Sequence, residues 1–106
     1  MNDLARLADE HLGAAKEARH GRSSEQLLHD GPLRQNLIAM AEGFKLDDHE
    51  PPVAAALLVL RGRVRLTAAG GDVELGEHQT APIPHERHGL TALEDSVFIL
   101  TTVTGV

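Results

Sequence analysis

Short apolar or alternating segments follow one another from Ser24 onward, and turn residues close most of them. The strand candidates are residues 33–41, 53–60, 63–67, 73–75, 79–84, 88–93 and 96–103. Segment 63–67 alternates polar and apolar residues, as a half-buried strand does, whereas 53–60 is apolar enough to be covered on both faces. Gly70 and Gly71 indicate a hairpin turn. Many short strands with close turns are typical of an antiparallel sandwich or barrel, so we predict an all-β domain.

Residues 3–20 differ from the rest because their apolar side chains recur at helical spacing. Leu4, Leu7 and Leu12 lie on one stripe, and Gly21 is a suitable stop signal. We therefore divide the chain into an N-terminal amphipathic helix, residues 1–22, and a β-domain, residues 23–106. The helix needs a surface to cover, either on the outside of the following domain or on a partner subunit.

Composition excludes several classes of function. The net charge of −6 argues against nucleic-acid and anionic-membrane partners, which attract an excess of Lys and Arg. The chain has no cysteine, so thiolate catalysis and thiolate metal sites are excluded. No apolar run reaches the roughly 18 residues of a membrane span, and no secretory signal is visible. We therefore expect a cytoplasmic protein.

Two motifs in the β-domain carry more specific information. The first runs G-F-K-L-D-D-H-E-P-P-V-A-A-A-L-L-V-L-R-G over residues 43–62, and the second runs L-G-E-H-Q-T-A-P-I-P-H-E-R-H-G-L over residues 75–90. In this order they resemble the motifs of a small single-domain cupin of the type 2 conserved barrel family. The resemblance covers about residues 33–103 and implies a double-stranded β-helix, the cupin jelly roll, preceded here by one α-helix. It also implies a homodimer.

The resemblance implies four metal-ligand positions, of which this chain keeps two. His49 matches the first histidine of the family and His88 the third, while Pro51 and Ala55 stand where the second histidine and the glutamate are expected. Two imidazoles seldom hold a metal ion, because protein sites usually supply three or four ligands. The implied site is therefore either lost or rebuilt.

Two neighbouring residues could rebuild the metal site. Asp47 lies two residues before His49, which puts both on one side of an extended strand, and His85 lies three residues before His88. Such a set would suit Fe, Mn, Ni or Zn. The alternative is that no metal binds, and that His49 and His88 are neutral core groups or line a cavity for a small organic ligand. Ala54, Ala55, Ala56 and Met40 would then form its apolar wall.

The remaining polar candidates have simpler interpretations. We expect His11, His20 and His29 to lie at the surface, and His78 to lie in a turn where the cupin pattern prefers Gly. Arg63 and Arg65 share one strand face, which we interpret as solvated. No serine has a Gly-x-Ser-x-Gly setting for nucleophilic catalysis.

Three functions remain open, and the sequence leaves undecided whether the chain is an enzyme. The first is a barrel that binds a divalent metal or a small organic ligand. The second is a metal-dependent oxygenase or isomerase with a rebuilt site. The third is a vestigial barrel that acts as a dimeric structural or interaction module, which a barrel filled by its own side chains would favour.

Overall fold

The computed structural model describes residues 1–105, with the side chain of His49 outside the described part. It contains one helix, α1 (Leu4–Glu17), followed only by strands. The strands are β1 (Arg22–Asp30), β2 (Leu33–Met40), β3 (Lys45–His49), β4 (Ala54–Arg61), β5 (Arg63–Ala68), β6 (Val73–Gly76), β7 (Thr80–Pro82), β8 (His88–Ala92) and β9 (Ser96–Val103). The all-β prediction with one N-terminal helix is confirmed.

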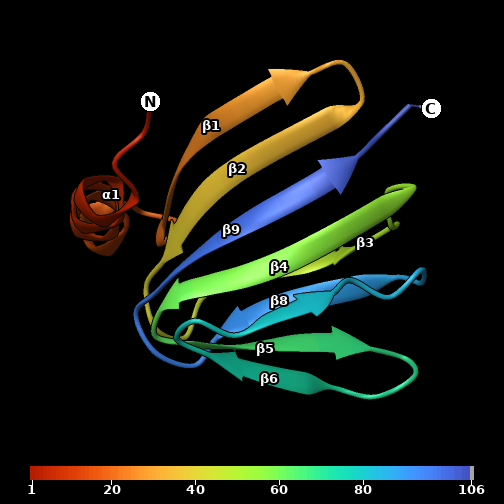
Figure 1. Cartoon of the computed structure of the whole chain (residues 1–106). Coiled ribbons are helices and arrows are strands. Elements are labelled where there is room, and N and C mark those ends of the chain that lie inside the picture. The colour runs from red at the N-terminus through yellow and green to blue at the C-terminus, as the bar shows by residue number, and fades with distance from the viewer. Residues whose placement is uncertain (106) are drawn as a thin grey trace.

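The strands form two antiparallel sheets that face each other (Figure 1). Sheet A has the order β1-β2-β9-β4-β7, and sheet B has the order β3-β8-β5-β6. The chain crosses from one sheet to the other at every connection except β1–β2 and β5–β6. These crossings make a jelly roll rather than a pair of meanders.

The main core lies between the inner faces of the two sheets. Its buried members are Met40, Leu57, Val59, Val64, Leu66, Leu75, Ile83, Leu90, Ala92 and Phe98. With aromatics at 2 per cent of the chain, this core consists almost entirely of aliphatic side chains. Strand alternation explains the selection, because every second residue of each strand faces inward.

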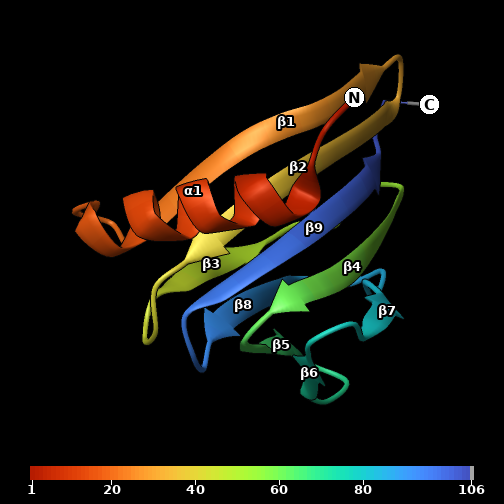
Figure 2. The same cartoon turned by 60° about the vertical axis from the view of Figure 1, so that its left-hand side comes forward.

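A second core lies on the outer face of sheet A, where α1 packs (Figure 2). Leu7, Ala8 and Ala15 of the helix meet Leu37 and Ala39 of β2, together with a valine of β9. The helix therefore covers its own domain, which is one of the two positions that the sequence left open. In the described part of the chain, no helix is long and apolar enough to cross a membrane.

The helix is shorter than the predicted span of 3–20. It ends at Glu17 because Ala18 takes an extended backbone, and its N–H is bonded back to the carbonyls of Ala14 and Ala15. Gly21 then turns the chain with φ 65°. The ring of Phe44 lies where a Gly21 Cβ would stand, so glycine is needed there for space as well as for conformation.

Sequence patterns did not indicate β1 and β3 as separate strands. Strand β1 is an edge strand with the sequence R-S-S-E-Q-L-L-H-D, and polar residues dominate it. Strand β3 reads K-L-D-D-H and forms the edge of sheet B. Edge strands bury little, so their sequences lack the apolar signal that identified the central strands.

Candidate functional site

The two histidines of the cupin motifs come from neighbouring strands of sheet B. Position 49 at the end of β3 pairs with His88 at the start of β8. His88 is buried, with 5% of its surface exposed, whereas the His49 side chain lies outside the described residues. The backbone therefore brings the two positions together, as the family resemblance implied.

The ring of His88 has a defined orientation. Its Nδ1 lies 2.9 Å from the carbonyl oxygen of Glu86. Because a carbonyl only accepts hydrogen bonds, Nδ1 carries the proton, and in the neutral ring Nε2 carries the lone pair. Holding one imidazole nitrogen in this way is how proteins commonly orient metal-binding histidines, although core histidines use the same bond.

The space beside His88 is small and apolar. Its other lining residues are Leu46, Leu57, Leu66, Ile83, Leu90, Phe98 and Leu100. The cavity volume is about 20 Å³, which is room for about one water molecule. Among the described residues, an organic ligand therefore has no preformed space beside His88.

The predicted alanine wall is only partly correct. Ala55 and Met40 pack into the main core, but Ala54 and Ala56 lie on the opposite face of β4. Their side chains point outward because successive residues of a strand alternate between its faces.

The role of Asp47 and His85 as replacement ligands stays a prediction. Asp47 and His85 are both exposed. The pairing of β3 with β8 shifts between Leu46 and His49, which interrupts the simple alternation behind the predicted Asp47–His49 face. Among the side chains that the structure describes, no three His, Asp or Glu residues lie close enough to hold a metal ion.

The described donors therefore do not fit a metal ion. Pro51 and Ala55 occupy two ligand positions of the motif, and the carbon-lined cavity beside His88 supplies no further nitrogen or oxygen. A site that includes the His49 side chain stays a prediction, and we derive no chemical step through a metal.

The irregular end of β3 depends on a close approach to β8. A Cβ at Gly89 would overlap Asp48 Oδ1 and would lie 3.1 Å from the Leu46 carbonyl oxygen. The side chain of Asp48 therefore lies directly against the β8 backbone. This contact gives Gly89 a packing role beside the histidine pair.

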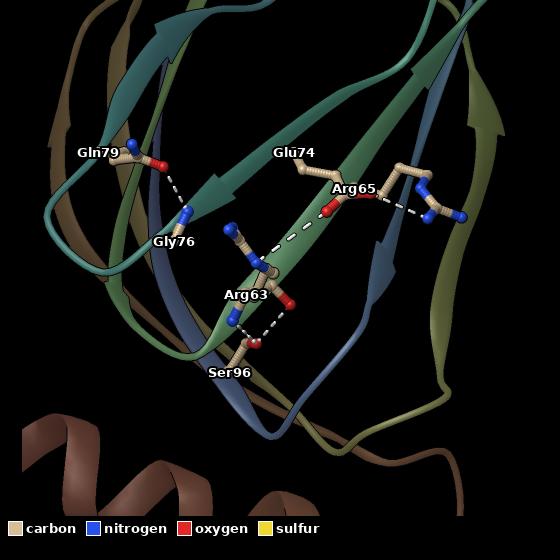
Figure 3. A network of polar contacts seen from close by, with 6 residues as sticks. All are labelled: Arg63, Arg65, Glu74, Gly76, Gln79 and Ser96. Atoms are coloured by element: carbon tan, nitrogen blue, oxygen red, sulfur yellow. Dashed lines mark hydrogen bonds and ion pairs between the residues drawn. The ribbon is translucent and has the colours of Figure 1, made fainter.

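The outer face of sheet B is polar, as the alternation of Arg63 and Arg65 predicted. Both arginines reach Glu74 of β6, with the shortest contacts at 4.0 Å for Arg63 and 3.0 Å for Arg65 (Figure 3). These side chains are 42–44% exposed, so the ion pairs contribute at most about 1 kcal/mol each. Beneath them, the buried Ser96 hydroxyl accepts from the Arg63 N–H and donates to the Glu94 carbonyl.

One carboxylate ties α1 to the β8–β9 turn. The backbone N–H of Glu42 donates to Asp95 at 2.9 Å, and Lys16 of the helix lies 3.3 Å from the same carboxylate. The hydrogen bond from Glu42, helped by Lys16, lowers the pKa of Asp95 below its ordinary value, although partial burial opposes the shift.

The prediction that His11 lies exposed at the surface is wrong. Its side chain is 16% exposed and lies between α1 and β1, where Nε2 donates to Glu25 Oε1 at 2.9 Å. Its Nδ1 lies 2.7 Å from Ser23 Oγ. The missed signal was spacing, because position 11 follows Leu7 and Ala8 at four and three residues and so belongs to the packed stripe.

Arg34 is a second residue that the sequence did not single out. Strand alternation places it on the inner face of sheet A, in register with Thr102, and its Nε is buried without a hydrogen-bond partner among the described residues. The two other half-buried arginines, Arg61 and Arg65, each pair with a carboxylate. A buried guanidinium nitrogen without a partner lowers stability, since it has lost its bond to water.

Only part of the outer face of sheet A is covered by α1. In Figure 1 the helix lies at one end of the sheet, and β2, β9 and β4 extend beyond it. Strand pairing places a continuous set of residues on this uncovered part, which we call the open apolar face: Leu28, Leu33, Gln35, Ala54, Ala56, Leu58, Ile99, Thr101 and Val103. None of these side chains is charged, but Asp30, which pairs with Leu33, places a carboxylate at the edge of the face. Gln35 donates to Thr101 at 3.2 Å. The expectation that segment 53–60 is covered on both faces is therefore met only near the helix.

No protein-family model and no curated protein matches this sequence. Solved structures resemble it closely in fold. A conserved protein of unknown function from Streptococcus pyogenes superposes with a TM-score of 0.75 at 22% identity, over 84% of this chain and 79% of that one. A cupin superfamily protein from Desulfitobacterium hafniense gives a TM-score of 0.75 at 19% identity, over 86% of this chain and 87% of that one.

The same fold also forms part of a larger protein. An HTH_3 family transcriptional regulator from Vibrio cholerae superposes with a TM-score of 0.69 at 18% identity, over 80% of this chain and 52% of that one. At these identities the similarity concerns the fold. The crossing pattern of the two sheets and these superpositions agree that the chain has a cupin-type jelly-roll fold, as the two motifs implied.

Proposed function

We propose that this chain is a non-catalytic interaction module whose barrel is a packed scaffold. The observation that carries the proposal is the interior beside His88, where about 20 Å³ remains between seven apolar side chains. Enzymes and small-molecule carriers usually have concave sites of roughly 300–1,000 Å³. The fold itself does not require catalysis, because one superfold hosts many functions.

The open apolar face is the surface through which such a module would act. Monomeric proteins rarely expose continuous apolar patches larger than a few hundred Å². Leu28 and Leu33 are 40% and 36% exposed at one side of this face. On the other side, Ala54, Ala56, Thr101 and Val103 border a shallow hollow of about 230 Å³.

We propose a second copy of this chain as the partner. Projecting leucines and a hollow lined by small residues occur on one face, and a two-fold axis would place the leucines of each copy against the hollow of the other. Each copy carries a net charge of −6, so repulsion is smallest where the contact surfaces carry no charge. The open apolar face carries a charge only at its edge, at Asp30.

Analytical ultracentrifugation over a range of concentrations tests this proposal. The unmodified chain should sediment as a dimer that dissociates on dilution, and Ala56→Glu should be a monomer because it buries a charge in the contact. Ala69→Glu, at an exposed alanine of the β5–β6 turn, is the matched control and should leave the dimer intact. A chain that is monomeric at every concentration, or a dimer that Ala56→Glu does not weaken, would refute the proposal.

A metal-binding function is the second candidate, and the orientation of His88 favours it. With Nδ1 bonded to the Glu86 carbonyl, the lone pair of the neutral ring is on Nε2, the nitrogen that could serve as a ligand together with His49. Metal content of tag-free protein should then be near stoichiometric for Fe, Mn, Ni or Zn, and should fall in His49→Ala and His88→Ala. Metal-free protein that takes up none of these ions would exclude this candidate and the oxygenase or isomerase that depends on it.

A further inference from the structure

A larger pocket than the barrel interior lies between the N-terminal half of α1 and the end of β4. Its volume is about 260 Å³. It is lined by Leu4, Ala5, Ala8, Leu60, Arg61 and His78. Four of these side chains are apolar and two carry nitrogen donors. The pocket lies apart from the histidine pair and from the open apolar face, with which it shares no residue.

The backbone at His78 is unusual. His78 has φ 65°, which is the left-handed region, and is the one non-glycine residue with a positive φ in the part of the chain that the structure describes. Its N–H donates to the Val59 carbonyl at 2.7 Å, which holds the β6–β7 turn against β4. Glycine would adopt this conformation more readily. Because His78 also lines a pocket, this unusual backbone points to a function for the imidazole.

Arg61 is the second polar group of the pocket. Its guanidinium pairs with Asp9 and donates to the Ala5 carbonyl at 3.3 Å, both on α1. The Arg61 side chain is 34% exposed and the Asp9 side chain is 71% exposed. Asp9 is therefore a weakly held partner at the rim, which another carboxylate could replace.

We propose that this pocket binds a small organic carboxylate with a short aliphatic body. Arg61 would hold the carboxylate in place of Asp9, since a guanidinium presents paired N–H groups to two carboxylate oxygens. The imidazole of His78 would donate an N–H to the same group, and Leu4, Ala8 and Leu60 would contact the aliphatic body. Inorganic phosphate fits less well, because it has no apolar part and the lining offers one permanent cation.

Nuclear magnetic resonance with butyrate as the probe tests the proposal directly. Butyrate should shift the amide signals of Ala5, Ala8 and His78 and the Arg61 Nε–H signal along one saturable curve, with a Kd of roughly 1 mM for so small a ligand. Butyramide has the same shape without the charge and should bind at least about tenfold more weakly. Phosphate should also be at least about tenfold weaker. Equal binding of butyrate with either control, or no saturable shift, would overturn the proposal.

Four variants separate binding from stability. Arg61→Gln should weaken butyrate at least about tenfold, and Asp9→Asn should tighten it because the internal competitor loses its charge. His78→Gly should also weaken butyrate, yet raise Tm by about 3 °C because backbone strain is relieved. Arg65→Gln, which removes a paired arginine of sheet B, is the control and should leave the butyrate affinity unchanged.

The opposite effects at His78 distinguish a binding group from a structural one. A His78→Gly variant with unchanged butyrate affinity would overturn the role of the imidazole, and unchanged affinity in both Asp9→Asn and Arg61→Gln would overturn the site. Preserved signal dispersion in the spectra shows that each variant is folded. The oligomeric state is measured separately, so failure here does not bear on the proposed dimer.

Discussion

The packed barrel predicts that two adjacent leucines of β4 differ sharply in their contribution to stability. Leu57 faces the interior and is 1% exposed, whereas Leu58 lies on the open apolar face and is only partly buried. Leu57→Ala removes a side chain that the main core surrounds and leaves a cavity there, which costs about 3 kcal/mol. For a domain of this size, that loss lowers Tm by about 12–15 °C.

Leu58→Ala is the matched control, with the same chemical change on the opposite face. It should cost less than about 1.5 kcal/mol, because the side chain is partly exposed before the change. Urea denaturation followed by circular dichroism measures both, since the chain has no Trp or Tyr for fluorescence. The comparison is made in the Ala56→Glu background, so that the proposed dimer does not bury Leu58. Equal losses, or a loss below about 1 kcal/mol for Leu57→Ala, would refute a tightly packed interior.

Three further predictions concern single positions. Asp95→Asn should lower the free energy of unfolding at neutral pH, because folding lowers the pKa of Asp95 and so favours its ionised form. The difference in free energy of unfolding between the variant and the unmodified chain should shrink as pH falls through the folded-state pKa. A difference that grows in acid would contradict this. Arg34→Met keeps the apolar stem and removes the unpartnered nitrogen, so the free energy of unfolding should stay equal or rise by about 1 kcal/mol. Urea titrations measure this change. A clearly lower free energy of unfolding would mean that the guanidinium has a partner that stabilises the fold. Gly89→Ala should cost about 1 kcal/mol or more, because its Cβ would lie 3.1 Å from the Leu46 backbone carbonyl oxygen and would displace the Asp48 carboxylate. Gly13→Ala in α1, with open space around it, should instead gain up to about 1 kcal/mol. The same urea titrations check the contrast, and similar effects at both glycines would contradict it.

Much of the fold was predictable because the two strands in the middle of sheet A are rich in apolar residues. Segments 53–60 and 96–103 were predicted as strands from their β-branched and aliphatic residues, and they pair with each other in the middle of sheet A. The edge strands β1 and β3 were missed because many of their side chains are polar and exposed to water, which leaves little apolar pattern in the sequence. The helix was predicted, but its last turn was not, since local spacing does not show where the chain must bend toward β1.

The site was less predictable than the fold. The two motifs singled out positions 49 and 88 as members of one site. In the structure these positions pair on the adjacent strands β3 and β8. The prediction that Asp47 and His85 complete a ligand set stays a prediction, because it depends on how β3 and the loop before β8 turn and on the His49 side chain. His11 shows the reverse case, since its partners Ser23 and Glu25 lie on another element and no local pattern indicated them.

The sequence by itself determined the class of architecture, the order of its main elements and the chemistry that is absent, including thiolate chemistry. These properties follow from residue type and short-range periodicity, which act over a few residues. Only the tertiary structure decided that aliphatic side chains fill the barrel, that α1 leaves part of a sheet face uncovered, and that Arg61 and His78 share a pocket. Volumes and pairings of this kind depend on contacts between residues far apart in the chain, where a shift of one strand position would reverse which face each side chain occupies.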